Sequence, residues 1–275
     1  MILARAILRA ANALVSLVVA VCLTVSGAYA CYALWDNRQV YSAAENVQLE
    51  MQKLKPRVEQ TEDQADQPVE PAPPSFDELL AVNQDVCAWL TVDNTKIDYP
   101  VLQGETNLDY INTDVYGNFA LAGSIFLDSR NDKTFADRYS LLYGHHMEGG
   151  RMFGDLDLFK DETFFNNNRS GELLLPDRVC TLKIFACLVA PASEENIFQP
   201  TLWTTDIDRF IEYARTEALF IDDEMIETTL HEAENPERVK VLAMSTCSSE
   251  YTDARTIVLA FLLEGEPQSI GRMVD

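Results

Sequence analysis

The longest apolar segment of the chain lies near its N-terminus. No Asp, Glu, Lys or Arg occurs from Ala10 to Trp35, a run of 26 residues. Because about 20 apolar residues suffice for a helix to cross a bilayer, this run predicts a transmembrane signal-anchor over residues 10–35. Arg5 and Arg9 precede the run and Asp36 follows it. The positive-inside bias therefore predicts a cytoplasmic tail over residues 1–9 and export of the rest of the chain.

A cleaved signal peptide is the alternative interpretation of this segment. Ala28-Tyr29-Ala30 resembles a small-residue cleavage site, and Cys31 follows it. The uncharged run is longer than the roughly 7–15 residues of a signal-peptide core, which favours an anchor that stays in place.

Residues 36–74 have the pattern of a stalk followed by a linker. Residues 38–55 carry mixed charges and are weakly helical, and Pro56 would end a helix there. From Thr61 to Pro74 the chain combines acids and Gln with four prolines and almost no apolar residues. Such a composition cannot bury a core and predicts a semi-extended linker.

A folded domain is predicted over residues 75–275. Ser75 and Glu78 have the spacing of a capping box, and the helix that they begin should run to about Asn83. If the preceding residues serve tethering alone, a chain that starts near Ser75 should be soluble and active.

Short strands dominate the pattern of this domain. Eight segments are apolar or alternate between apolar and polar residues, and Gly, Asn, Asp or Pro bounds each of them. They lie near residues 88–92, 97–102, 122–127, 139–144, 172–175, 179–189, 239–247 and 255–264. The fold class is therefore mainly β, an eight-stranded closed or nearly closed barrel with a few peripheral helices. Helices are predicted near residues 107–113, 152–159 and 205–220.

The charge of the chain excludes one class of partner. With 21 Lys and Arg against 44 Asp and Glu, the net charge is −23 over 275 residues. A field of this sign repels phosphate backbones, so nucleic acid is not an expected partner.

Six cysteines need an account in an exported protein, where thiols usually pair. Cys180 and Cys187 lie on one predicted strand, about 23 Å apart, which is too far for a disulfide within that strand. Together with Cys87 they are expected to be buried free thiols. Cys22 and Cys31 fall in or beside the predicted membrane span, so Cys247 remains as the candidate for chemistry.

Cys247 ends one predicted strand, and Arg255 begins the next after a seven-residue polar loop. If the two residues oppose each other across this hairpin, their side chains project from the same face. A guanidinium beside a thiol favours the thiolate, and it also stabilises the oxyanion that forms when sulfur attacks a carbonyl. The alternative is a core cysteine beside an arginine that reaches into solvent.

A general base is sought among three histidines. His231 lies in an acidic stretch and receives no role, whereas His145 and His146 follow the strand that ends at Gly144. Adjacent residues of a strand point in opposite directions, so at most one of this pair should face Cys247. A metal site is the competing interpretation of the pair, but no second cluster with metal-ligand spacing accompanies it. No metal and no organic cofactor is expected.

Several separated motifs of the exported domain resemble those of the class B sortases. The similarity runs from Ser75 to about Glu264. The motifs are Ile97-Asp98-Tyr99-Pro100-Val101, Thr106-Asn107-Leu108-Asp109-Tyr110, Gly123-Ser124-Ile125-Phe126-Leu127-Asp128, Tyr143-Gly144-His145-His146-Met147 followed by Met152-Phe153, and Ser245-Thr246-Cys247 followed by Arg255-Thr256. The family's Thr-Leu-Ser-Thr-Cys appears as Ala243-Met244-Ser245-Thr246-Cys247, which departs at the two positions farthest from the sulfur.

The resemblance implies an eight-stranded sortase barrel on the outer face of a Gram-positive cell membrane. It implies a catalytic site of Cys247, Arg255 and the histidine directly after Gly144, which is His145. It also matches four residues to the family's peptide groove and its flank: Asn107, Ile111, Tyr143 and Ser245.

The implied function is a membrane-anchored cysteine transpeptidase. It would cleave the C-terminal sorting signal of secreted proteins and join the acyl group to an amine of a cell-wall precursor or a pilin lysine. Two alternatives stay open: a secreted cysteine endopeptidase that releases its product to water, and an inert surface or pilus-assembly scaffold. Papain-like endopeptidases place Cys before His, whereas His145 precedes Cys247 here.

Overall fold

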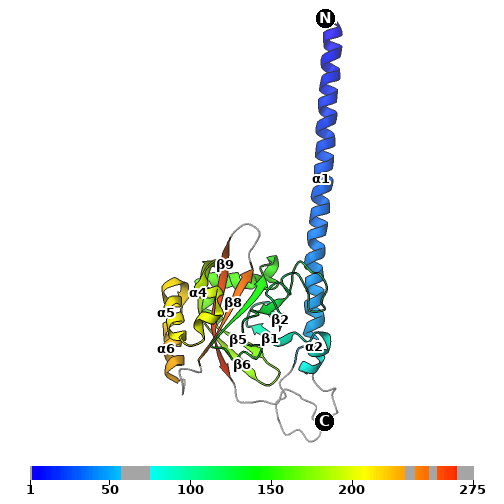
Figure 1. Ribbon diagram of the computed structural model, residues 1–275. Coiled ribbons are helices and arrows are strands. Elements are labelled where there is room, and N and C mark those ends of the chain that lie inside the picture. The colour runs from blue at the N-terminus through cyan, green and yellow to red at the C-terminus, as the bar shows by residue number, and fades with distance from the viewer. Residues whose placement is uncertain (1, 57–74, 233–238, 248–252, 265–275) are drawn as a thin grey trace. The chain divides into compact units, whose positions relative to one another are not determined.

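The computed structural model describes residues 2–56, 75–232, 239–247 and 253–264 (Figure 1). The predicted linker from Thr61 to Pro74 lies outside these residues, as does most of the predicted loop after Cys247. The chain divides into two compact units, Met1–Ala43 and Ala44–Asp275.

The first unit is helical. Helix α1 (Ile2–Gln52) starts here, and its segment Arg9–Gln52 is long and apolar enough to cross a membrane. The apolar side chains of this part, such as Leu14 and Leu34, are exposed. The predicted helix over 10–35 and the weakly helical stalk join without a break, and the helix ends four residues before Pro56.

Eight strands of the second unit close into a barrel. Around the ring they are β1 (Val86–Val92), β2 (Asp98–Leu102), β3 (Ile125–Leu127), β4 (Tyr139–His145), β8 (Lys240–Cys247), β9 (Ala254–Glu264), β6 (Val179–Pro191) and β5 (Ser170–Leu174). Strand β5 also pairs with β1, which closes the sheet. All eight predicted strands are confirmed. The short β7 (Ala218–Ile221), which extends the sheet beside β6, was not predicted as a strand.

The direction of the strands matters for the site. Strands β2 and β3 run parallel, as do β4 and β8, and the other neighbours are antiparallel. Parallel neighbours need a long connection. The connection from β4 to β8 contains β5, β6, β7 and several helices.

The helices lie outside the ring. They are α2 (Phe76–Val82), α3 (Glu162–Asn167), α4 (Glu195–Phe198), α5 (Ile207–Glu217) and α6 (Asp223–Glu232), with the 3-10 helices η1 (Glu148–Gly150), η2 (Gly154–Lys160) and η3 (Pro200–Trp203). The capping box is confirmed, because the Ser75 backbone N–H donates to Glu78 Oε2 at 3.0 Å. The predictions near 152–159 and 205–220 match η2 and α5, although α5 ends earlier and β7 follows it.

The predicted helix over 107–113 is wrong. This segment forms consecutive turns instead. The carboxylate of Asp109 accepts hydrogen bonds from both the backbone N–H and the hydroxyl of Thr106, each at 2.8 Å. Such local side-chain bonds offer the backbone an alternative to a helix.

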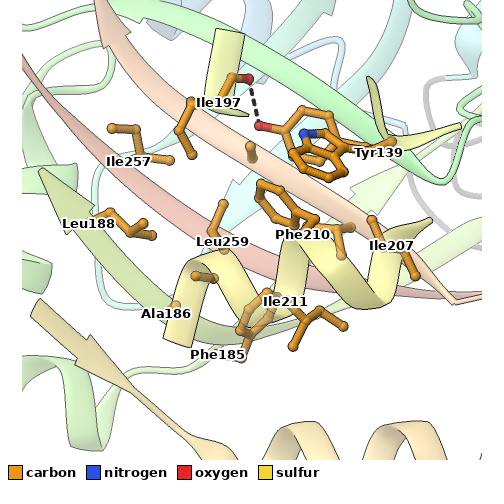
Figure 2. Packing of buried hydrophobic residues seen from close by; sticks show 14 of the residues in the cluster. Tyr139, Phe185, Ala186, Leu188, Ile197, Ile207, Phe210, Ile211, Ile257 and Leu259 are labelled. Carbon is orange, nitrogen blue, oxygen red and sulfur yellow. Dashed lines mark hydrogen bonds between the residues drawn. The ribbon is translucent and has the colours of Figure 1, made fainter. Parts of the chain in front are cut away.

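A cluster of buried apolar side chains packs α4, η3, α5 and α6 against β4, β6, β8 and β9 (Figure 2). The rings of Tyr139 on β4 and Phe210 on α5 meet edge to face with 4.7 Å between centroids. The Tyr139 hydroxyl donates to the Ile197 carbonyl of α4 at 2.9 Å. Both contacts fix the start of β4, the strand that ends at His145.

The last turns of α1 belong to the packing of the second unit. Met51 is 2% exposed and lies in a cluster with Phe76, Trp89 and Leu102. Lys55 Nζ donates to Asp98 Oδ1 at 2.7 Å. A chain that starts at Ser75 therefore lacks part of the packed domain.

We expect Met51→Ala to lower the free energy of unfolding of the second unit by about 2–4 kcal/mol, because it leaves a cavity among well-packed apolar side chains. Urea unfolding of a chain that starts at Ala44 measures this change. Leu49→Ala is the matched control on the same helix, since Leu49 is 53% exposed. Equal losses in the two variants would show that this end of α1 is not part of the core.

Candidate active site

Two strand ends bring together the first pair of predicted site residues. Strands β4 and β8 pair in parallel from Tyr139 with Val241 to His145 with Cys247. Positions 145 and 247 are thus direct neighbours across a ladder whose strands lie about 4.8 Å apart. Partners in register project to the same face of the sheet. The backbone therefore places His145 beside Cys247, although 102 residues separate them in the sequence.

Arg255 approaches from the other side of β8, where β8 and β9 form the predicted hairpin (Figure 1). Their pairing ends at Ser245 with Ile257, and the same register, extended by two residues, places Arg255 opposite Cys247. Arg255 Nη1 donates to the Thr246 carbonyl at 3.2 Å. Its Nε is buried and has no hydrogen-bond partner among the described residues. The bond from Nη1 thus holds the guanidinium beside the end of β8.

The imidazole of His145 is held by a backbone carbonyl. Its Nε2 lies 2.7 Å from the carbonyl oxygen of Ile111. Because a carbonyl only accepts, Nε2 carries a hydrogen, and Nδ1 is the atom left for proton exchange. Burial lowers the pKa of His145 below its usual value, and the nearby charge of Arg255 adds to this, while the bond to Ile111 opposes it.

Two glycines make the close approaches around His145 possible. A Cβ at Gly144 would lie 2.4 Å from Ile125 Cδ1 and 2.8 Å from Phe153 Cγ, so any larger residue would displace the strand just before the histidine. A Cβ at Gly123 would lie 2.4 Å from the Ile111 carbonyl oxygen, and its φ of +58° also favours glycine. Gly144 thus lets β4 pass close to Ile125 and Phe153, and Gly123 leaves room for the Ile111 carbonyl that binds His145.

Asn107 and Tyr143, two of the predicted groove residues, meet at a buried carboxylate. Asp128 accepts from Asn107 Nδ2 at 2.9 Å and from the Tyr143 hydroxyl at 3.0 Å. Burial acts to raise the pKa of Asp128, but hydrogen bonds from Arg130 and Asn107 hold it below its usual value. Sequence reasoning assigned Asp128 no role, although it closes one of the motifs quoted above.

The other two predicted groove residues, Ile111 and Ser245, do not contact Asp128 in this way. Ile111 reaches the site through its carbonyl oxygen on His145. Ser245 is fully buried beside Tyr143 in the register of β8 with β4, and its hydroxyl donates to the Thr246 carbonyl at 3.2 Å. The structure thus separates Ser245 from the exposed surface.

The remaining histidines and cysteines lie apart from this group. His146 Nε2 contacts Asp157 Oδ2 at 3.1 Å, and His231 lies near the end of α6. Cys87, Cys180 and Cys187 are buried and free, as predicted. Within the described part of the chain, no three His, Cys, Asp or Glu side chains gather as a metal site.

The lowered pKa of His145 predicts how stability changes with pH. The unfolded chain, whose histidines titrate near pH 6.5, binds more protons than the folded chain below that pH, so stability falls as the pH drops through this range. We expect His145→Gln to flatten this fall between about pH 7.5 and 5, since Gln keeps an N–H donor and does not titrate. Urea unfolding at several pH values measures the slope. A slope unchanged by the substitution would contradict the burial argument.

No family model matches the chain, but the similar proteins and solved structures described below are all class B sortases. A crystal structure of a Streptococcus pyogenes class B sortase involved in pilus biogenesis is 39% identical, with a TM-score of 0.59, and the match covers 68% of this chain and 97% of that one. Sortase B of Staphylococcus aureus is 26% identical over 70% of this chain and 75% of its own length. Sortase B of Listeria monocytogenes is 27% identical over 66% and 71%.

The closed barrel and these relatives define a sortase, a cysteine transpeptidase. Within this class the chain belongs to the class B sortases. The family and the fold that the motifs indicated are both confirmed.

Proposed function

We propose that this class B sortase cleaves the C-terminal sorting signal of secreted proteins and joins the new acyl end to an amine of a cell-wall precursor or a pilin. The observation that carries the proposal is the convergence of three strand ends: His145 pairs with Cys247 in register, and Arg255 follows on the neighbouring strand. These three residues are the catalytic group of the proposal.

In the first half-reaction the Cys247 thiolate attacks the carbonyl carbon of a Thr–X peptide bond. The N–H groups of Arg255 donate to the oxyanion of the tetrahedral intermediate. The imidazolium of His145 then protonates the leaving amine, the C–N bond breaks, and the acyl group remains on sulfur as a thioester. The Nδ1 of His145 fits its task, because the Ile111 carbonyl occupies Nε2. The bond from Arg255 Nη1 to the Thr246 carbonyl holds the guanidinium at the strand ends for its own task.

In the second half-reaction an incoming amine attacks the thioester. Neutral His145 accepts its proton, and the thiolate leaves as the new amide forms. The lowered pKa of His145 favours this neutral state, so the ring is ready as a base once it has given up its proton. The thiol and the imidazole titrate as one coupled pair in this scheme.

The four predicted groove residues are proposed to act at the peptide site in different ways. Tyr143 is half-buried and stacks on Phe198 of α4 with 6.3 Å between ring centroids, so its ring offers an apolar wall. Asn107 shares Asp128 with Tyr143 and is held beside it. Ile111 acts through its carbonyl, and Ser245 supports the floor from inside the protein.

The proposed location is the outer face of the cell membrane. Helix α1 contains one segment that is long and apolar enough to span, and the arginines before it place residues 1–9 in the cytoplasm. In this arrangement residues 10–35 are the anchor, residues 36–74 the stalk and linker, and residues 75–275 the catalytic domain, with the end of the stalk packed on that domain. A cleaved signal peptide is the alternative.

Two observations bear on the amine acceptor. The S. pyogenes relative is described as involved in pilus biogenesis, which favours a pilin lysine over a wall precursor. The net charge of −23 also attracts cationic amines at long range.

The test is a product assay with the full chain in detergent. Sorting-signal peptides are incubated with and without a lysine-containing or oligoglycine amine, and the products are weighed by mass spectrometry. We expect a covalent thioester on the protein and an amide product that depends on the added amine. Hydrolysis at the same rate with and without amine would favour the endopeptidase, and the absence of any adduct would favour the inert scaffold.

A further inference from the structure

The carboxylate of Asp157 is hydrogen-bonded to residues that stand next to the proposed catalytic residues in the sequence. Asp157 in η2 accepts from the Thr256 hydroxyl at 2.6 Å and lies 3.1 Å from His146 Nε2. Lys160 Nζ pairs with it at 2.8 Å. Three donors from three segments therefore converge on a single side chain.

Each strand partner in this network is adjacent to a catalytic residue in the sequence. His146 follows His145, and Thr256 follows Arg255. The backbone N–H of Thr256 in turn donates to Thr246 Oγ1 at 3.1 Å, and Thr246 precedes Cys247. Consecutive residues of a strand point to opposite faces, so the network lies on the reverse side of the strands from the catalytic group.

The sheet supplies only part of the support at these strand ends, since β6 pairs with β9 as far as Ala254 and β4 pairs with β8 as far as Cys247. Among the described residues, the pairing of β8 with β9 ends at Ser245 and Ile257, two residues before Cys247 and Arg255. Strand β4 ends at His145 itself. Between β8 and β9, beyond Ser245 and Ile257, the bond from Thr256 to Thr246 takes the place of the ladder, and the bond from Thr256 to Asp157 ties β9 to η2.

We propose that Asp157 is a positioning residue, which fixes the ends of β4 and β9 so that His145 and Arg255 meet at Cys247. This inference rests on the proposed function, since it takes those three residues as the catalytic group. Asp157 acts through Thr256 and His146 and does not touch the substrate.

The chemistry of the side chain suits this task. Burial acts to raise the pKa of Asp157, but hydrogen bonds from Lys160 and Thr256 and the charge of His146 hold it below its usual value. At neutral pH both oxygens are therefore acceptors that carry charge, and charged acceptors make the shorter and stronger hydrogen bonds. Asn has the same shape but only one acceptor, so it cannot serve Thr256, His146 and Lys160 together.

The test compares kcat and KM for amide formation by the full chain and its variants. We expect Asp157→Asn and Thr256→Val each to lower kcat about tenfold and to change KM less than about twofold, because small displacements of catalytic groups slow the chemical step more than binding. Thr256→Ser, which restores the hydroxyl, should keep most of the activity. The double variant should be no slower than Asp157→Asn alone, since both changes break the same connection.

Asp155→Asn is the matched control, because Asp155 lies in the same 3-10 helix and instead accepts from the Lys96 backbone N–H at 2.7 Å. It should react like the wild type. Equal activity of Asp157→Asn and wild type, or equal losses in Thr256→Ser and Thr256→Val, would overturn the positioning role. If Asp157→Asn does not unfold cooperatively, the two Thr256 variants decide. Failure of the proposed function shows differently: Cys247→Ala would then retain activity.

Discussion

Cys247→Ala should abolish the acyl-enzyme and lower transpeptidation at least about 10⁴-fold, because the sulfur is the attacking atom of the proposed mechanism. The buried thiols Cys87 and Cys187 cannot replace it. Burial raises the pKa of Cys87 and Cys187 to about 12, so both remain protonated at neutral pH. Only thiolates are nucleophilic, and buried thiols are inert toward peptides.

Intact-protein mass spectrometry after incubation with a sorting-signal peptide measures this loss directly. The wild type should gain one acyl group, and Cys247→Ala should gain none. Cys187→Ala is the control thiol variant and should be acylated like the wild type. A thioester on Cys247→Ala, or its loss in Cys187→Ala while the protein stays folded, would refute the assignment of the nucleophile.

Arg255→Ala should lower kcat by about 10²–10³-fold, the usual cost of removing one donor from an oxyanion site. The guanidinium has two tasks that a single ammonium group cannot perform together. Its Nη1 donates to the Thr246 carbonyl, while its remaining terminal N–H groups carry the proposed bond to the oxyanion. Arg255→Lys keeps the charge but loses the planar fork of donors, so we expect it to recover only a small part of the activity.

Single-turnover acylation separates this effect from peptide binding. Arg215→Ala is a suitable control, because Arg215 pairs with Asp223 and Glu227 at the surface of the outer helices. That variant should acylate at the wild-type rate. If Arg255→Lys reacted as fast as the wild type, positive charge alone would be sufficient and the directed donor would be unnecessary.

The parts of the fold and site that depend on local sequence were predictable. The eight strands follow from short apolar runs bounded by turn residues, and the hairpin of β8 and β9 follows from two such runs with a polar loop between them. The same hairpin places Arg255 near Cys247, because antiparallel neighbours in the sequence usually pair.

The pairing of position 145 with position 247 was not predictable from the residues in this way. It depends on the parallel pairing of β4 with β8 across 102 residues, and no local pattern encodes that register. Only the resemblance to a family selected His145 over His146. The segment 107–113 was predicted as a helix, whereas the bonds between Thr106 and Asp109 favour consecutive turns.

Asp128 and Asp157 were missed for a related reason. In the sequence they are two of 44 acidic residues, and their partners come from distant segments. The carboxylate of Asp128 accepts hydrogen bonds from Asn107 and Tyr143, and that of Asp157 contacts His146 and Thr256. Spacing patterns describe one element at a time, so a carboxylate that joins several elements has no signature before the fold is known.

The parallel neighbours β4 and β8 also constrain how the newly made protein becomes an enzyme. Closing so long a stretch of chain is slow, since its entropic cost comes before the contacts that reward it. Until the C-terminal hairpin docks, the imidazole and the sulfur stay apart, and the emerging polypeptide has no working nucleophile. In the proposed mechanism, catalytic competence would therefore arise only when β8 docks beside β4.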